Sequence, residues 1–153
     1  MQLARAGCVI EIERCRRVNE RLEDTPELRA NEVEVRMLAS RERVPGVRAL
    51  AADMAMREDF DLDAISDLRL AVEEACAAVL ANAAPESTLV CRLLVSTDLL
   101  EINASATLRS GSEPEVGSMS LRILRTLADS VDCWTSTSNG QRQFHVQLTK
   151  AQP

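Results

Sequence analysis

The chain has 153 residues, of which 46% are hydrophobic and 27% charged, with a formal net charge of -6. Length and composition predict one globular domain around a single hydrophobic core, and they exclude a disordered or collagen-like chain. The acidic balance and the near absence of aromatic residues leave neither a basic face for phosphates nor a stacking platform for bases, so direct nucleic-acid binding is not expected. Apolar runs are short and no signal-type leader is evident, which predicts a cytoplasmic protein without a membrane segment.

Cysteine usage argues against both a disulfide framework and a zinc site. The five cysteines form an odd set without a C-x-x-C motif, and the chain has one histidine. Neither the paired cysteines of a secreted scaffold nor the ligand spacing of a zinc site is therefore present. We expect no structural metal, and we expect Cys76, Cys91 and Cys133 to be reduced core residues.

Residues 1–30 read as a charged N-terminal extension. They carry six basic and six acidic side chains and end near the Thr25-Pro26 breaker. Their apolar residues have only weak helical spacing, which permits either a short charged helix or a loosely attached, disordered segment. The weakly spaced residues are Val9, Ile12, Cys15, Val18 and Leu22.

Residues 31–150 carry the pattern of a folded domain. Apolar and charged residues alternate over 32–37, which predicts a strand with one wet face. Pro45 suits the first turn of a helix reaching to about Arg57, and Asp61 or Asp63 can cap a longer helix that ends before Pro85. Later segments predict strands over 88–96 and 99–108, followed by a loop over 110–117. A third helix is expected to open at Ser118, and the residues on its apolar face are Leu121, Leu124, Leu127 or Ala128, and Val131. The chain then closes with a hairpin of 131–137 and 143–149 around Asn139-Gly140.

The order of these elements predicts an α+β fold. Helices are grouped early in the chain and antiparallel strands are grouped around a third helix, which is typical of a two-layer sandwich with a mostly antiparallel sheet and helices on one face. By this count the other face of the sheet is either solvated or bound by a partner.

Three segments resemble the RsbW/SpoIIAB anti-sigma factors of the GHKL, histidine-kinase-like ATPase superfamily. They are residues 67–76, with the sequence DLRLAVEEAC, residues 124–131, with LRTLADSV, and the terminal hairpin. The most similar members are actinobacterial proteins of the UsfX type. The resemblance covers about residues 31–150 and implies a GHKL or Bergerat-like fold.

The helix motif of the family's ATP site is incomplete in this chain. Glu74 matches the family glutamate that acts as base or positions water, but Ala78 stands where an asparagine ligates Mg²⁺ one turn later. A methyl group cannot bind a metal ion. Asn82, a further turn along the same face, could replace that ligand only if the nucleotide moved by about 5 to 6 Å. Glu74 is thus either a vestigial site residue or a surface charge.

The remaining motifs of that site are also eroded. Between residues 99 and 128 no aspartate is present to accept from an adenine amino group. The Gly-x-Gly that opens the third helix in the family is Ser118-Met119-Ser120 here, so side chains occupy space that backbone should leave for phosphates. Ser118 and Ser120 fit an N-cap and a first-turn residue better than phosphate ligands. These losses imply a degenerate ATP lid. No cofactor is therefore expected, although ATP and Mg²⁺ belong to the family's site.

The resemblance implies a homodimeric anti-sigma factor in a partner-switching system. Such a protein sequesters an alternative sigma factor of the stress or sporulation type, and a STAS-domain anti-anti-sigma factor counters it. Arg48 matches a family arginine that faces the sigma factor, with Arg41 and Arg43 as lesser candidates, although a lone helical arginine is commonly a surface solubiliser. The alternative function is an active ATP-dependent serine kinase that phosphorylates the STAS antagonist. His145 is expected to be a solvated or hydrogen-bonded strand residue.

Overall fold

The computed structural model describes residues 28–153, so the extension predicted over 1–30 lies almost wholly outside the described residues. From the N-terminal side the elements are β1 (Glu32–Leu38), the 3-10 turn η1 (Arg41–Arg43), α2 (Val44–Arg57), α3 (Leu62–Asn82), β2 (Thr88–Ser96), β3 (Leu99–Thr107), α4 (Ser118–Leu127), β4 (Ser130–Ser138) and β5 (Gln141–Ala151). Each strand and helix expected from periodicity within 31–150 is present, with boundaries shifted by a few residues at most.

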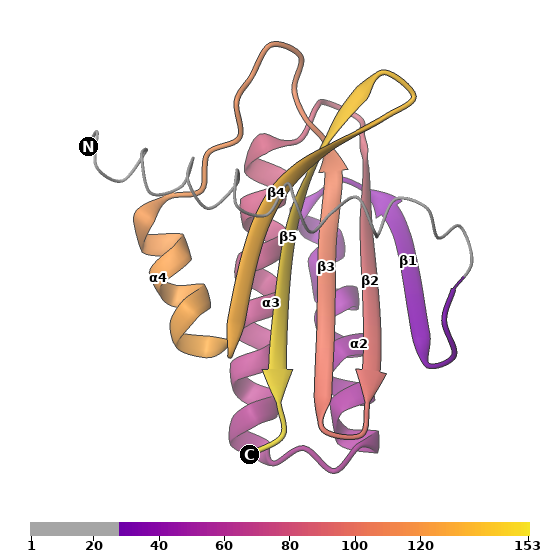
Figure 1. Cartoon of the computed structure of the whole chain (residues 1–153), viewed down its shortest axis with the longest axis vertical. Helices are drawn as coiled ribbons and strands as arrows, with labels where there is room; N and C mark the ends of the chain where they lie inside the picture. The colour runs from indigo at the N-terminus through magenta and orange to yellow at the C-terminus, as the bar shows by residue number, and fades with distance from the viewer. Residues whose placement is uncertain (1–27) are drawn as a thin grey trace.

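The strands form one five-stranded sheet in the order β1-β2-β3-β5-β4, and every neighbouring pair is antiparallel. Helices α2 and α3 lie behind the sheet, and α4 lies beside the β4 edge against α3 (Figure 1). The predicted α+β sandwich with an antiparallel sheet and helices on one face is therefore confirmed.

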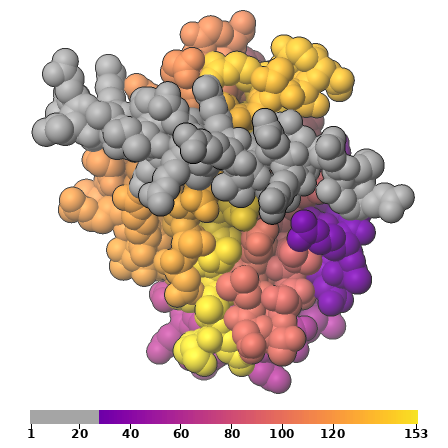
Figure 2. Space-filling view, in the orientation of Figure 1, coloured from indigo at the N-terminus to yellow at the C-terminus, as the bar shows by residue number. Residues whose placement is uncertain are grey.

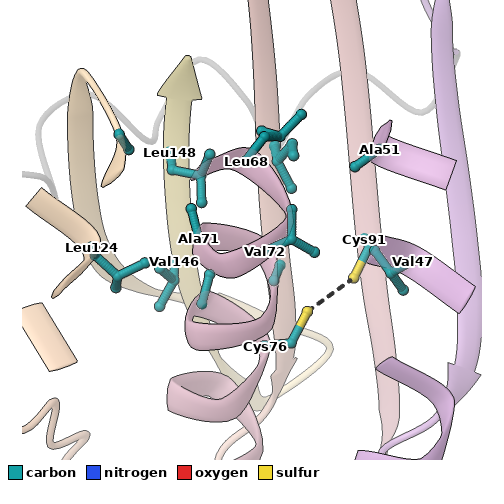
Figure 3. Close-up of a cluster of buried hydrophobic side chains, with 14 of the residues drawn as sticks. Val47, Ala51, Leu68, Ala71, Val72, Cys76, Cys91, Leu124, Val146 and Leu148 are labelled. Atoms are coloured by element: carbon teal, nitrogen blue, oxygen red, sulfur yellow. Dashed lines mark hydrogen bonds between the residues drawn. The ribbon is translucent and has the colours of Figure 1, made fainter. Parts of the chain in front are cut away.

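The core lies between the sheet and the helices. Alternate residues of β3 and β5 are buried, as the two-residue period of a strand requires, and they meet the apolar stripe of α3. Leu68 and Val72 of α3 have no exposed surface and pack with Val146 and Leu148 of β5 (Figure 3). Burying each such side chain contributes about 1.5 to 3 kcal/mol to the free energy of unfolding.

Cys76 and Cys91 meet inside this core, and their sulfur atoms lie 4.0 Å apart (Figure 3). The hydrogen bond with Cys91 and burial together raise the pKa of Cys76 well above its usual value. Cys133 is also buried. The prediction that these three cysteines are core residues is confirmed, whereas Cys8 and Cys15 lie outside the described residues.

Helix and turn ends follow local backbone chemistry. Of the two predicted caps for α3, Asp61 is the one used, because its side chain accepts from the Ala64 N–H at 2.7 Å. The prediction that Ser118 caps α4 is wrong: Gly117 is the N-cap, and Ser118 is the first helical residue. Placing Val131 on that helix is also wrong, because α4 ends at Leu127 and Val131 lies in β4.

Candidate functional site

The carboxylate of Glu74 lies where α3 meets α4. The Ser120 hydroxyl, in the first turn of α4, donates to Glu74 Oε1 at 2.5 Å. Both side chains are half-buried, so solvent screens this charge-assisted hydrogen bond only in part. The structure thus brings together two residues that the sequence analysis named separately. The Ser120 hydroxyl binds the carboxylate of Glu74, which is the glutamate that this chain retains from the family's helix motif.

Asn82 forms a second bridge from α3, to the loop that precedes α4. Its Nδ2 donates to the carbonyls of Ala78 and Glu115, both at 2.8 Å, and its Oδ1 accepts from the Glu115 N–H at 2.9 Å. The side chain is only 5% exposed, so these bonds are shielded from water. We call the contact made by Glu74–Ser120 and Asn82–Glu115 the α3–α4 seam.

The side chains of the seam do not fit a magnesium nucleotide. Ala78 offers no ligand for a metal ion. Both polar atoms of the Asn82 amide, Nδ2 and Oδ1, already form hydrogen bonds to backbone groups. Within 28–153 no three His, Cys, Asp or Glu residues are grouped so that they could hold a metal ion. A nucleotide entering here would have to separate Ser120 from Glu74, and Ser118, the other predicted ligand, is exposed at the start of α4.

The predicted partner-binding arginines lie at the N-terminal end of α2. Arg41 and Arg43 are exposed in η1, and Arg48 follows one turn into the helix. Arg48 is already paired, because its Nη1 lies 2.5 Å from Oε2 of Glu73 on α3. Their side chains are 31% and 52% exposed, so the pair lies at the surface, where such pairs contribute up to about 1 kcal/mol. The sequence analysis did not find this pair, because Arg48 and Glu73 are 25 positions apart.

Lys150 is a further residue that sequence reasoning did not single out. Its ammonium group donates to the carbonyl oxygen of Leu127, at the C-terminal end of α4, at 2.9 Å, and to Asp67 of α3 at 3.3 Å. A cation at the C-terminus of a helix is stabilised by the free carbonyl groups there. Lys150 therefore ties β5 to both helices that form the seam.

Comparison with known proteins agrees with the motifs. No protein-family model matches the chain. It is 38% identical over 101 residues to the anti-sigma-F factor RsbW of Mycobacterium tuberculosis, with the same values for the CDC 1551 and H37Rv strains. This chain resembles RsbW. The predicted resemblance to the RsbW/SpoIIAB anti-sigma factors is confirmed, and the match covers 65% of this chain but only 59% of the length of its RsbW relatives.

A solved structure supports the RsbW-like fold. The crystal structure of the RsbU and RsbW domains of Rv1364c from Mycobacterium tuberculosis superimposes with a TM-score of 0.55 at 15% identity. The match covers 81% of this chain and 34% of that one. At this level of identity the likeness establishes the fold alone. None of the helices within 28–153 combines the length and the apolar character needed to cross a bilayer.

Proposed function

We propose that this chain is an anti-sigma factor that binds and sequesters an alternative sigma factor. The observation that carries the proposal is the 38% identity to anti-sigma-F factor RsbW over 101 residues. A sequestered sigma factor cannot reach RNA polymerase core, so the consequence is negative regulation of transcription in the cytoplasm. A STAS-domain anti-anti-sigma factor releases the sigma factor by competition.

The η1–α2 end is the surface we assign to the sigma factor. Arg41, Arg43 and Arg48 place three guanidinium groups on one short stretch of a protein that is acidic overall. An acidic patch on the partner can accept from such groups in bidentate geometry. In this proposal a partner carboxylate replaces Glu73 as the acceptor for Arg48.

That exchange gives the surface a specific test. Arg48→Ala removes the guanidinium group that would bind the partner carboxylate. It should weaken sigma-factor binding about thirtyfold, or about 2 kcal/mol. Glu73→Gln leaves Arg48 unpaired in the free protein and should strengthen binding, because the partner no longer competes with an internal carboxylate. Arg57→Ala is the matched control, since Arg57 is paired with Asp53 at 2.8 Å at the other end of α2. Equal affinities for all three variants would contradict the assignment.

Binding in this proposal does not depend on a nucleotide. The seam is bridged by its own side chains, and the metal-ligand position holds Ala78. Release is then mass action between the sigma factor and the antagonist, without phosphoryl transfer. The test is transcription in vitro by core polymerase with an alternative sigma factor of the host, where adding this chain without ATP should inhibit initiation from the cognate promoter. Undiminished transcription at a large excess of the chain would refute the proposal.

An active serine kinase is the second candidate function, and the retained carboxylate of Glu74 favours it. This function requires the Ser120–Glu74 hydrogen bond to open so that a nucleotide can enter. Incubation with a STAS antagonist and labelled ATP separates the two proposals, because only the kinase transfers label to the antagonist.

We further propose that the chain forms a homodimer through β1. This strand is an edge of the sheet, and Val33, on its helix side, is 37% exposed. Exposed edge strands present unpaired backbone groups that favour association with another chain. Light scattering should give twice the mass of one chain at micromolar concentration.

A further inference from the structure

Large apolar side chains are exposed where α3 and α4 lie side by side. Leu70 of α3 is 56% exposed, and Met119 and Ile123, four positions apart on one side of α4, are 65% and 37% exposed. Single exposed hydrophobic residues are common on soluble proteins, whereas contiguous ones mark interaction surfaces. Figure 2 views the molecule from the sheet side, so α3 lies mostly behind the strands and α4 is seen at the left edge. We call these three residues the α3–α4 apolar patch.

Two ties between the helices show that the patch residues are neighbours. The Ser120–Glu74 hydrogen bond joins the beginning of α4 to α3, and Lys150 joins the end of α4 to an earlier turn of α3. The two helices therefore run antiparallel. Leu70 lies one turn before Glu74, and Ile123 lies one turn after Ser120. Because the helices run in opposite directions, both steps lead the same way, and the two apolar residues lie at the same height on adjacent helices.

The patch is continuous with the surface proposed for the sigma factor. Glu73, one turn from Leu70 on α3, pairs with Arg48 of α2, whereas Glu74 binds α4 on the other side. Arg48, Leu70 and Ile123 therefore follow one another across three adjacent helices. Packed helices lie about 8 to 10 Å apart, so the distance from α2 to α4 is about 16 to 20 Å. A helix of about 11 to 13 residues spans this distance.

The charges around the patch favour an acidic occupant. Arg69 of α3 and Arg122 of α4 are exposed, and α4 contains no acidic residue. The acidic groups of α3 nearest to the patch are each engaged within the chain, Glu73 by Arg48, Glu74 by Ser120 and Asp67 by Lys150. A segment that carries acidic side chains beside apolar ones therefore complements this surface.

We infer that an amphipathic helix of the sigma factor lies across α2, α3 and α4, with acidic residues toward Arg48 and apolar residues on the α3–α4 apolar patch. This inference rests on the proposed function, and it adds an apolar part to a surface that was assigned to arginines alone. Amphipathic helices bind such surfaces through apolar side chains spaced by three and four residues. The charged pairs at the Arg48 end then fix the orientation of the helix, and burial of the patch supplies affinity.

Two matched double variants test the patch. Leu70→Ser/Met119→Ser removes its two most exposed side chains. Met56→Ser/Leu62→Ser makes the same two exchanges where α2 ends and α3 begins, at side chains that are 55% and 80% exposed. Calorimetry with the sigma factor whose transcription the parent inhibits should show binding weakened about tenfold or more in the patch variant and unchanged in the control. Salt should leave this loss unchanged, whereas the loss in Arg48→Ala should shrink as salt rises.

A charge variant tests the same surface without removing apolar area. Arg122→Glu places a negative charge against the acidic partner, so it should weaken sigma-factor binding, and Arg122→Lys should retain most of the affinity. Parental affinity in Arg122→Glu, or equal weakening in Arg122→Glu and Arg122→Lys, would contradict the charge assigned to the partner.

Three results would overturn the inference, and they separate it from the proposed function. Equal sigma-factor affinity in the patch variant and its control, while Arg48→Ala still weakens binding, would remove the patch from the surface and leave the proposed function standing. A parent chain that binds no sigma factor of its host would refute the proposed function and this inference together. A patch variant that keeps parental affinity but falls from dimer to monomer mass in light scattering would assign the patch to a second copy of the chain.

Discussion

Replacing Asn82 by alanine should destabilise the domain measurably, because this one side chain closes the loop before α4 onto α3. The change removes two hydrogen bonds that cross to Glu115 and one to the carbonyl of Ala78. Each bond to a backbone group is worth about 1 kcal/mol net. The Ala78 carbonyl keeps its helical partner, so the two bonds to the loop dominate. With the lost packing of a side chain that is 5% exposed, the expected loss is about 2 to 3 kcal/mol.

Thermal unfolding followed by circular dichroism measures this loss. For a domain of this size, 1 kcal/mol corresponds to about 3 °C, so Asn82→Ala should lower Tm by about 6 to 9 °C. Asn82→Asp keeps the acceptor for the Glu115 N–H, but it turns a carboxylate oxygen toward the carbonyl groups of Ala78 and Glu115 and buries a charge, so it should destabilise the domain at least as much as alanine. Thr126→Ala is the control, because that exposed hydroxyl only donates to a carbonyl of its own helix.

Hydrogen exchange shows whether the effect arises at the seam. The Glu115 amide proton should exchange faster in Asn82→Ala than in the parent, by more than the global change in stability accounts for. A melting temperature within the error of the parent, together with unchanged exchange at Glu115, would refute the reasoning that Asn82 holds the loop.

Three further predictions concern other parts of the molecule. Arg48→Ala should change the free energy of unfolding by less than about 1 kcal/mol, because its ion pair is at the surface, and denaturant titration checks this value. The lowered pKa of His145 means that the unfolded chain binds the proton more readily, so stability should fall as pH drops from about 6.5 to about 4. His145→Gln should flatten that part of the pH profile, and an unchanged profile would contradict the assignment. Val33→Lys and Val35→Lys together should shift light scattering toward the monomer mass, provided circular dichroism shows that the sheet persists.

Periodicity predicted the elements of this fold because each depends on residues close in sequence. The alternation from Glu32 to Met37 reflects the two faces of a single strand, one turned toward the helices and one turned away from them, and Asp61 lies within one turn of the N–H that it caps. The error at Ser118 has a local cause as well. Gly117 adopts the extended backbone of the N-cap one residue earlier, and a serine side chain is not required there.

The contacts of the candidate site depend on distant residues, and so the sequence could not supply them. Arg48 and Glu73 are 25 positions apart, and Asn82 and Glu115 are 33 apart. The motif comparison assigned Glu74 and Asn82 to one helical face, but it could not reveal that Ser120 and the preceding loop already engage their polar atoms. The stack of Trp134 on His145 could have been anticipated only from the register of the final hairpin.

Binding of the sigma factor with and without nucleotide tests the central claim most directly. Calorimetry should be performed with this chain and an alternative sigma factor of its host, first without nucleotide and then in saturating Mg-ATP. The account predicts the same dissociation constant in both conditions, and a separate titration with Mg-ATP alone should give a Kd no tighter than about 0.1 to 1 mM. Sigma-factor binding that appears only with Mg-ATP, or micromolar binding of the nucleotide itself, would contradict the claim that the seam is closed by its own side chains.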